Sequence, residues 1–100
     1  MRDQAGDTTD QQFRALKKNL AANVRALRLK AGKTQSGLAS VLGCEATYVQ
    51  KLEYGTAAPS LKLLVALALA LDVEVAALLQ RSGATNKRSV GRPKKSPAAR

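Results

Sequence analysis

The side chains of this sequence are suited to hydrogen bonding and to ionic contacts, and not to bond-making chemistry. The 100 residues contain no histidine and one cysteine, Cys44. A disulfide within the chain, a zinc site built from several cysteines or histidines, and catalysis that needs histidine are therefore excluded. No acid, base and nucleophile are clustered, so we expect no enzyme, no metal and no cofactor or other small-molecule ligand.

The charge of the chain indicates a polyanionic partner. Seventeen Lys and Arg residues stand against seven Asp and Glu residues, which gives a net charge of +10. The excess is concentrated in residues 81–100, which hold seven basic residues and no acid. Nucleic acid is the commonest polyanion that such a protein binds. A solvated surface with a solubilising tail is the alternative that charge alone leaves open.

Residues 34–53 have the pattern of two short helices joined by a glycine turn. Ala39 is small, as a close crossing of two helices requires, and Gly43 permits the turn between them. Val49 and Leu52 would hold the second helix against the first and leave its opposite side free. The N-terminal residues of such a helix project outward, and the major groove of DNA, about 12 Å wide, accepts them.

The same stretch resembles the helix-turn-helix of the Cro/repressor-like (Xre-type) regulators. The resemblance extends over residues 17–80 and rests on an ordered set: Leu27-Arg28, Gly32, Thr34-Gln35, Leu38-Ala39, Leu42-Gly43, Tyr48-Val49, Leu52-Glu53, Gly55, Pro59-Ser60-Leu61, Leu71 and Val73. It implies an all-α fold and a dimer that binds double-stranded DNA in a sequence-specific way.

The resemblance also implies which side chains contact DNA. The residues that face base edges correspond to Glu45, Ala46, Thr47, Gln50 and Lys51. Gln50 suits adenine, Lys51 suits guanine, and Thr47 offers a methyl group to thymine. The phosphate contacts correspond to Lys33, Thr34, Gln35 and Tyr48, and a structural salt bridge corresponds to Arg28 and Glu53.

Three residues around the start of the second short helix depart from the family pattern. Glu45 replaces a small hydroxyl residue, and near DNA it should either repel phosphate or accept from a cytosine amine. Ala46 offers no hydrogen bond, so more of the specificity falls to the shape of the DNA. Cys44 replaces valine or a similar residue, and we interpret it as a small buried hydrophobe rather than a redox switch.

A second DNA contact is predicted in residues 82–100, a basic tail that we expect to be disordered when unbound. Gly91-Arg92-Pro93 resembles the core of an AT-hook, which lies in the narrow minor groove of A·T-rich DNA. The match is incomplete, because Val90 replaces the usual basic residue. Groove insertion and unspecific attraction to phosphate both stay open for the contact residues, which would be Lys87, Arg88, Gly91, Arg92, Pro93, Lys94 and Lys95.

Five helices are predicted to position these residues, over about 13–31, 35–42, 45–54, 61–71 and 74–80. Thr34 and Ser60 are suited to cap the second and the fourth. Residues 1–11 are polar and turn-prone, and we expect a flexible arm there. The domains are thus an arm over 1–11, a helix-turn-helix domain over 12–81 and a tail over 82–100.

The fourth helix is apolar on every side, which indicates burial on more than one face. We assign its core face to Leu61, Leu64, Val65, Leu67, Ala68 and Leu71, and its second face to Leu63, Ala66, Leu69 and Ala70. In a domain of this size the second face would meet another chain, most simply in a symmetric dimer. Packing by the N-terminal arm or by Phe13 is the alternative.

The sequence therefore predicts a cytoplasmic, nucleoid-associated regulator, a repressor that acts as a homodimer on a two-fold symmetric operator. The longest apolar run, over residues 63–71, is about half the length of a membrane span, so no membrane contact is expected. An alternative of another class is an antitoxin or adaptor that binds a partner protein through the fourth and fifth helices. A sequence-tolerant nucleoid protein is a third alternative, supported by the tail alone.

Overall fold

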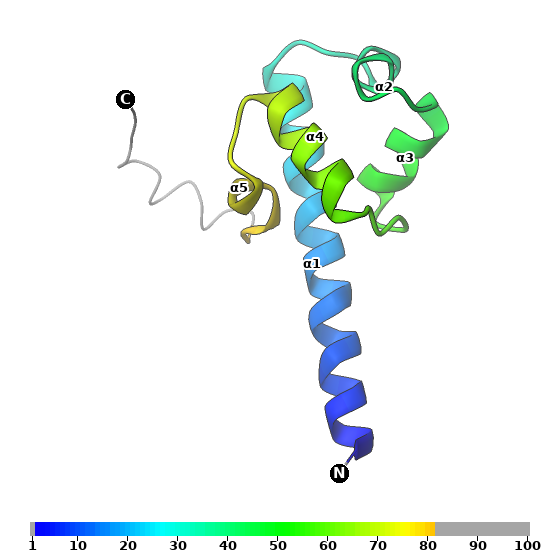
Figure 1. Cartoon of the computed structure of the whole chain (residues 1–100), viewed down its shortest axis with the longest axis vertical. Helices are drawn as coiled ribbons and strands as arrows, with labels where there is room; N and C mark the ends of the chain where they lie inside the picture. Colours follow the sequence, from blue (N-terminus) through cyan, green and yellow to red (C-terminus); the bar gives the residue numbers. More distant parts are fainter. Residues whose placement is uncertain (1, 82–100) are drawn as a thin grey trace.

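The computed structural model describes residues 2–81 and the side chains of residues 8–81. This part of the chain is all-helical, as predicted, and it consists of α1 (Arg2–Lys30), α2 (Gln35–Leu42), α3 (Ala46–Tyr54), α4 (Leu61–Leu71) and α5 (Val75–Leu79). Helices α2 to α5 gather around the C-terminal half of α1, and the N-terminal half of α1 projects beyond them (Figure 1). The predicted tail contacts at residues 87–95 lie outside the described residues.

Helix α1 begins earlier than the sequence predicted. Residues 2–11, which we expected to form a flexible arm, continue the helix to Arg2. They contain no proline, and their one glycine, Gly6, costs a helix only about 1 kcal/mol relative to alanine. The side chains of residues 8–12 are exposed. The prediction of an arm was wrong because a polar composition is common to flexible arms and to solvent-exposed helices.

Local capping sets the starts of α2 and α4. Thr34 Oγ1 accepts a hydrogen bond from the Gly37 N–H at 2.9 Å, and Ser60 Oγ accepts one from the Leu63 N–H at 3.1 Å. Both caps were predicted, and each satisfies an amide that the start of a helix leaves free. Gly43 ends α2 with a φ of 76°. This left-handed conformation, which glycine adopts without strain, turns the chain sharply into α3.

The core lies where α2 to α5 meet the C-terminal half of α1. Every helix contributes to its fully buried side chains, which are Val24, Leu38, Val49, Leu52, Leu67 and Leu78. Helices α2, α3 and α5 are only eight, nine and five residues long. Helices of that length are marginal in isolation, so packing in this shared core stabilises them.

Helix α4 exposes residues that the sequence analysis placed in the core. Leu61 and Val65 are 72% and 44% exposed. The prediction of their burial was wrong because a helix that is apolar on every side has no periodicity from which its buried face can be identified. The residues that α4 does bury are Leu67, Ala68 and Leu71. Of the predicted second face, Leu69 is exposed, while Leu63, Ala66 and Ala70 are half-buried.

Two asparagines of α1 hold the end of α5. Asn23 Nδ2 donates to the carbonyl oxygens of Leu78 and Gln80, both at 2.8 Å. Asn19 Nδ2 donates to the carbonyl oxygen of Leu79 at 3.1 Å. The last carbonyls of a helix have no amide partner within it, so these side chains act as a cap from another element.

No helix within residues 2–81 combines the length and the apolar character that crossing a bilayer demands. In the same part of the chain, no three histidine, cysteine or acidic side chains gather in the way that metal ligands do.

Candidate nucleic-acid interface

The outer side of α3 presents polar side chains around a shallow hollow. Val49 and Leu52 are buried and hold the inner side of the helix on the core. Thr47, Gln50 and Lys51 are exposed, and their spacing of three and four residues places them on one face of the helix. They border a hollow of about 320 Å³. Three of the five residues that we predicted to face bases are therefore together and accessible.

Two residues that the sequence analysis missed border the same hollow. Tyr54 is 84% exposed and lies seven residues after Thr47, two helical turns along the same face. Thr56 follows the helix, and its N–H and Oγ1 donate to the Lys51 carbonyl oxygen at 3.0 and 3.3 Å. Between them Gly55 has a φ of 87°, which turns the chain back at the end of α3. The spacing of Tyr54 from Thr47 is the sequence feature that would have identified it.

The residues at the start of α3 differ in their exposure to solvent. Glu45 is exposed, and its side chain makes no capping hydrogen bond. Ala46 and Tyr48, which we predicted to contact a base and a phosphate, are half-buried and pack against the core, as does Cys44. Burial, and after it the neighbouring Cys44, raises the pKa of the Tyr48 hydroxyl. The hydroxyl therefore stays neutral at physiological pH.

An ion pair shielded from solvent joins α1 to α3. Arg28 Nε donates to Glu53 Oε2 at 2.6 Å, and Arg28 Nη2 donates to Glu53 Oε1 at 3.0 Å. The two side chains are 9% and 5% exposed. A bidentate pair of this kind combines charge with two directed hydrogen bonds. The pair that the sequence analysis expected to be structural thus fixes α3 on α1.

The entrance of α2 is tied to the same ion pair. Gln35 Nε2 donates to Glu53 Oε1 at 3.1 Å, and Arg28 Nη1 donates to the Lys33 carbonyl oxygen at 2.9 Å. Burial raises the pKa of the Glu53 carboxyl, but hydrogen bonds from Arg28 and Gln35 and the attraction of Arg28 outweigh it, and the pKa lies below its ordinary value of 4.5. Glu53 therefore stays ionised at neutral pH and holds one of the two N–H groups of the Gln35 amide.

The other two predicted phosphate ligands lie beside Gln35. Lys33 is half-buried, and Thr34 is exposed. The Thr34 hydroxyl oxygen is engaged as the N-cap of α2, which leaves its O–H available as a donor. Backbone and side-chain contacts thus hold the segment 33–35 in a defined position relative to α3.

Comparisons with known proteins give one consistent result. Residues 24–78 match the family model that is described as Helix-turn-helix (HTH_3). The chain is 36% identical to Control protein C.SmaI of Serratia marcescens over 75 residues, 75% of this chain and 89% of that protein. Among solved structures, the hypothetical transcription factor NHTF from Neisseria has a TM-score of 0.68 and 32% identity, over 72% of this chain and 83% of that one. The restriction-modification controller protein C.AhdI from Aeromonas hydrophila has a TM-score of 0.61 and 34% identity, over 65% of this chain and 94% of that one.

Proposed function

This chain belongs to the helix-turn-helix family of DNA-binding transcription regulators, and we propose that it acts as a homodimeric repressor on a two-fold symmetric operator. The observation that carries the DNA contact is the outer face of α3, where Thr47, Gln50 and Lys51 border one accessible hollow while the opposite face is buried. The homodimer is supported by the hydrophobic residues that α4 leaves exposed. The proteins that it resembles are regulators. The chain is accordingly a regulator and not an enzyme.

The three exposed side chains of α3 supply the base contacts in this proposal. The Gln50 amide pairs with the edge of adenine, and the Lys51 ammonium donates to the O6 and N7 acceptors of guanine. Thr47 offers its methyl group to thymine. Glu45, exposed at the start of α3, accepts from a cytosine amine where the operator provides one.

Phosphate contacts on either side of the groove position α3. On one side, the N–H group of Gln35 that Glu53 leaves free donates to a phosphate oxygen, together with Lys33 and the Thr34 hydroxyl. On the other side, Tyr54 and Thr56 lie at the C-terminal end of α3, where a recognition helix leaves the bases and approaches the backbone. Ala46 and Tyr48 are half-buried against the core, so in this proposal they support the position of α3 more than they contact bases or phosphates.

The relatives support a more specific role. C.SmaI is a control protein, and C.AhdI is a restriction-modification controller protein. We therefore propose that the operator of this chain lies before genes of a restriction-modification system, and that the protein works in the cytoplasm, where that DNA is. The antitoxin or adaptor alternative has no comparable support.

Selection of bound sequences from a random pool of double-stranded DNA tests the proposal. We expect the full-length chain to enrich one site with two inverted half-sites, spaced about one helical turn, or 34 Å, apart. A variant in which Gln50 and Lys51 are both alanine keeps the fold, because both side chains are exposed, and should lose the enrichment. Recovery of unrelated sequences by the wild type would contradict sequence-specific binding, and a single unrepeated half-site would contradict the dimer.

A further inference from the structure

The apolar face of α1 continues beyond the body of the domain. Leu20 and Val24 of this face are buried in the core, whereas Phe13 and Leu16, two turns and one turn before Leu20, are 47% and 42% exposed. The ammonium of Lys17 lies 4.7 Å from the centre of the Phe13 ring. Two large hydrophobic side chains are thus left partly exposed where the projecting part of α1 leaves the body.

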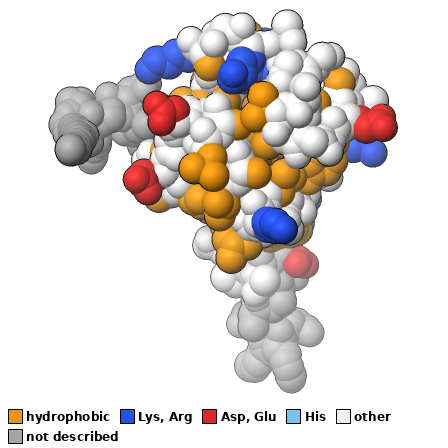
Figure 2. All heavy atoms as spheres, turned by 45° about the horizontal axis from the view of Figure 1, so that its top comes forward, with side chains coloured by type: hydrophobic (Ala, Val, Ile, Leu, Met, Phe, Trp, Pro, Cys, Tyr) orange, Lys and Arg blue, Asp and Glu red, His pale blue; other side chains and the backbone are white. Residues whose placement is uncertain are grey.

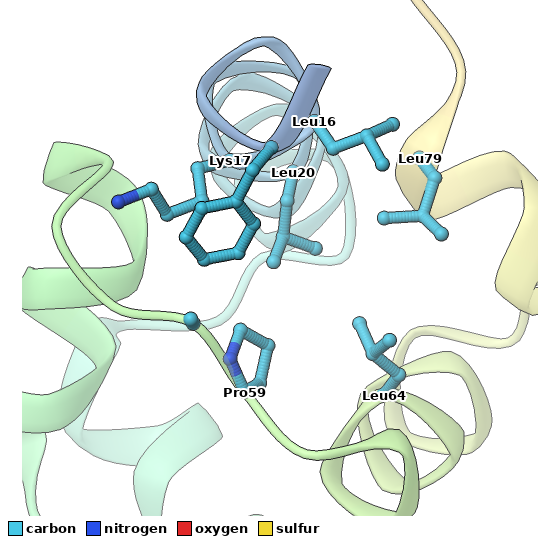
Figure 3. A pocket seen from close by; sticks show the side chains of 8 residues that line it. Leu16, Lys17, Leu20, Pro59, Leu64 and Leu79 are labelled. Atoms are coloured by element: carbon cyan, nitrogen blue, oxygen red, sulfur yellow. The ribbon is translucent and has the colours of Figure 1, made fainter. Parts of the chain in front are cut away.

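These two side chains form one wall of an apolar groove. The lining is completed by Lys17, Leu20, Ala58, Pro59, Leu64 and Leu79, so that α1 faces α4, α5 and the segment before α4 across an open space (Figure 3). The groove has a volume of about 150 Å³. An apolar cavity of about that volume holds a molecule the size of benzene, so the groove has room for a leucine side chain. We call it the α1 groove.

A ridge of exposed hydrophobic side chains lies beside the α1 groove. Leu61, Val65 and Leu69 are spaced by four residues along α4, and all three are exposed. Groove and ridge share a border, because Leu64 is the residue before Val65 and Pro59 precedes Leu61 by two residues. Figure 2 shows hydrophobic side chains gathered in the lower part of the body, next to the point where the projecting part of α1 leaves it. We call the three residues the α4 ridge.

We propose that the α4 ridge of one protomer packs into the α1 groove of a second copy of this chain, so that Phe13 and Leu16 belong to the dimer interface. A two-fold symmetric interface must be complementary to itself, and a groove beside a ridge on one face meets that condition. An exposed apolar patch of this kind marks an interaction site. The inference rests on the proposed homodimer. It adds the α1 groove to the interface, which the sequence analysis had placed on α4.

The basic tail of this chain does not suit the groove. Residues 82–100 have one large hydrophobic residue, Val90, among basic, polar and small residues. Placing the basic residues in an apolar groove would remove their charges from water without a partner. The second copy, in contrast, offers two leucines and a valine at a spacing that places them on one side of a helix.

Sedimentation equilibrium of the full-length chain tests the inference. The change is Phe13→Glu together with Leu16→Glu, which places two charges on the groove wall at positions that the core does not need. The matched control is Leu29→Glu, which changes an exposed leucine on the opposite side of α1. We expect the double variant to raise the dimer dissociation constant by at least about tenfold, a change of about 1.4 kcal/mol. Leu29→Glu should leave it unchanged, and the melting curves of both variants should report an intact fold.

The outcomes separate this inference from the proposed dimer. A wild-type dimer that the groove variant leaves equally tight would overturn the inference and leave the homodimer standing. A wild type that stays monomeric at tens of micromolar, alone and on DNA, would overturn both. If the groove variant keeps the dimer but deletion of residues 82–100 dissociates it, the tail and not the α1 groove supports the dimer, and the inference fails.

As a second variant, Leu61→Glu on the ridge should weaken the dimer to a similar extent, and a tight Leu61→Glu dimer would overturn the packing of ridge into groove.

Discussion

At the scale of single residues, Glu53 connects three helices through one carboxylate. It lies on α3 and accepts hydrogen bonds from Arg28 of α1 and Gln35 of α2. Glu53→Ala would leave the Arg28 guanidinium buried without its partner. Removal of one member of a buried ion pair costs about 3–5 kcal/mol, and we expect the free energy of unfolding in urea to fall by that amount. Glu74→Ala is the matched control, because Glu74 is exposed and makes no capping hydrogen bond, and it should change stability by less than about 0.5 kcal/mol.

The same carboxylate gives a second readout, the pH dependence of stability. The pKa of Glu53 in the folded protein is below its ordinary value of 4.5, so its ionised form stabilises the fold above that pH. This contribution is lost as the pH falls through the folded pKa. The difference in unfolding free energy between the wild type and Glu53→Ala should therefore be constant near neutral pH and shrink below about pH 4. A difference that does not change with pH would show that Glu53 acts through packing alone.

Lys51 tests whether the outer face of α3 discriminates between bases. Its contact with guanine forms only where guanine stands in register, so Lys51→Ala should cost about 1–3 kcal/mol on the selected operator and much less on random DNA. Binding of both DNAs is measured at one salt concentration, because affinity for DNA depends strongly on salt. Lys18→Ala, on the exposed surface of α1, removes the same charge away from the hollow and should not distinguish the two DNAs. Equal losses for Lys51→Ala on both would assign Lys51 to phosphate.

At the scale of elements, α5 is the helix most dependent on others. It has five residues, and Asn23 donates to two of the carbonyls at its end. Asn23→Ala leaves these acceptors without their donor, which should lower the free energy of unfolding by about 1–3 kcal/mol. Hydrogen exchange of the α5 amides should accelerate more than that of α3. Gln12→Ala, an exposed change on the same helix, serves as control, and equal exchange rates in α5 for both variants would mean that the two hydrogen bonds from Asn23 do not hold the helix.

The elements also show what could be predicted from the sequence. Thr34 and Ser60 lie three residues from the amides that they cap, so the starts of α2 and α4 could be read from local chemistry. The buried face of α4, and the contact of Asn23 with α5, depend on tertiary packing that no local pattern records. On α3, the exposure of Gln50 and Lys51 was predictable, because the apolar residues Val49 and Leu52 are spaced so that they lie on the opposite, buried face of the helix. The hydrogen bond from Gln35 to Glu53 was not, because it requires α2 to be packed across α3.

At the scale of the whole molecule, the two proposed surfaces share no residue. The hollow for DNA is bordered by residues 47–56, and the α1 groove and the α4 ridge use residues of α1, α4, α5 and the segment before α4. A dimer formed through the second surface therefore leaves both α3 helices accessible. Accessible α3 helices in both protomers are what binding to two half-sites of a symmetric operator requires.

The charge of the whole molecule leads to the last prediction, which concerns residues 82–100. These hold six of the seventeen basic residues and no acid, and the core is built from residues 20–78. Deletion after Arg81 should therefore leave the melting temperature unchanged and reduce the salt dependence of DNA binding. Each phosphate contact that is lost lowers the slope of log affinity against log salt by about 0.9, and several should be lost together. Within the full-length chain, Arg92→Ala separates two modes of contact. If Gly91-Arg92-Pro93 enters the minor groove, the change weakens operators flanked by A·T tracts more than those flanked by G·C pairs, whereas attraction to phosphate alone makes the flanks irrelevant. An unchanged salt slope after the deletion would show that the tail does not touch DNA.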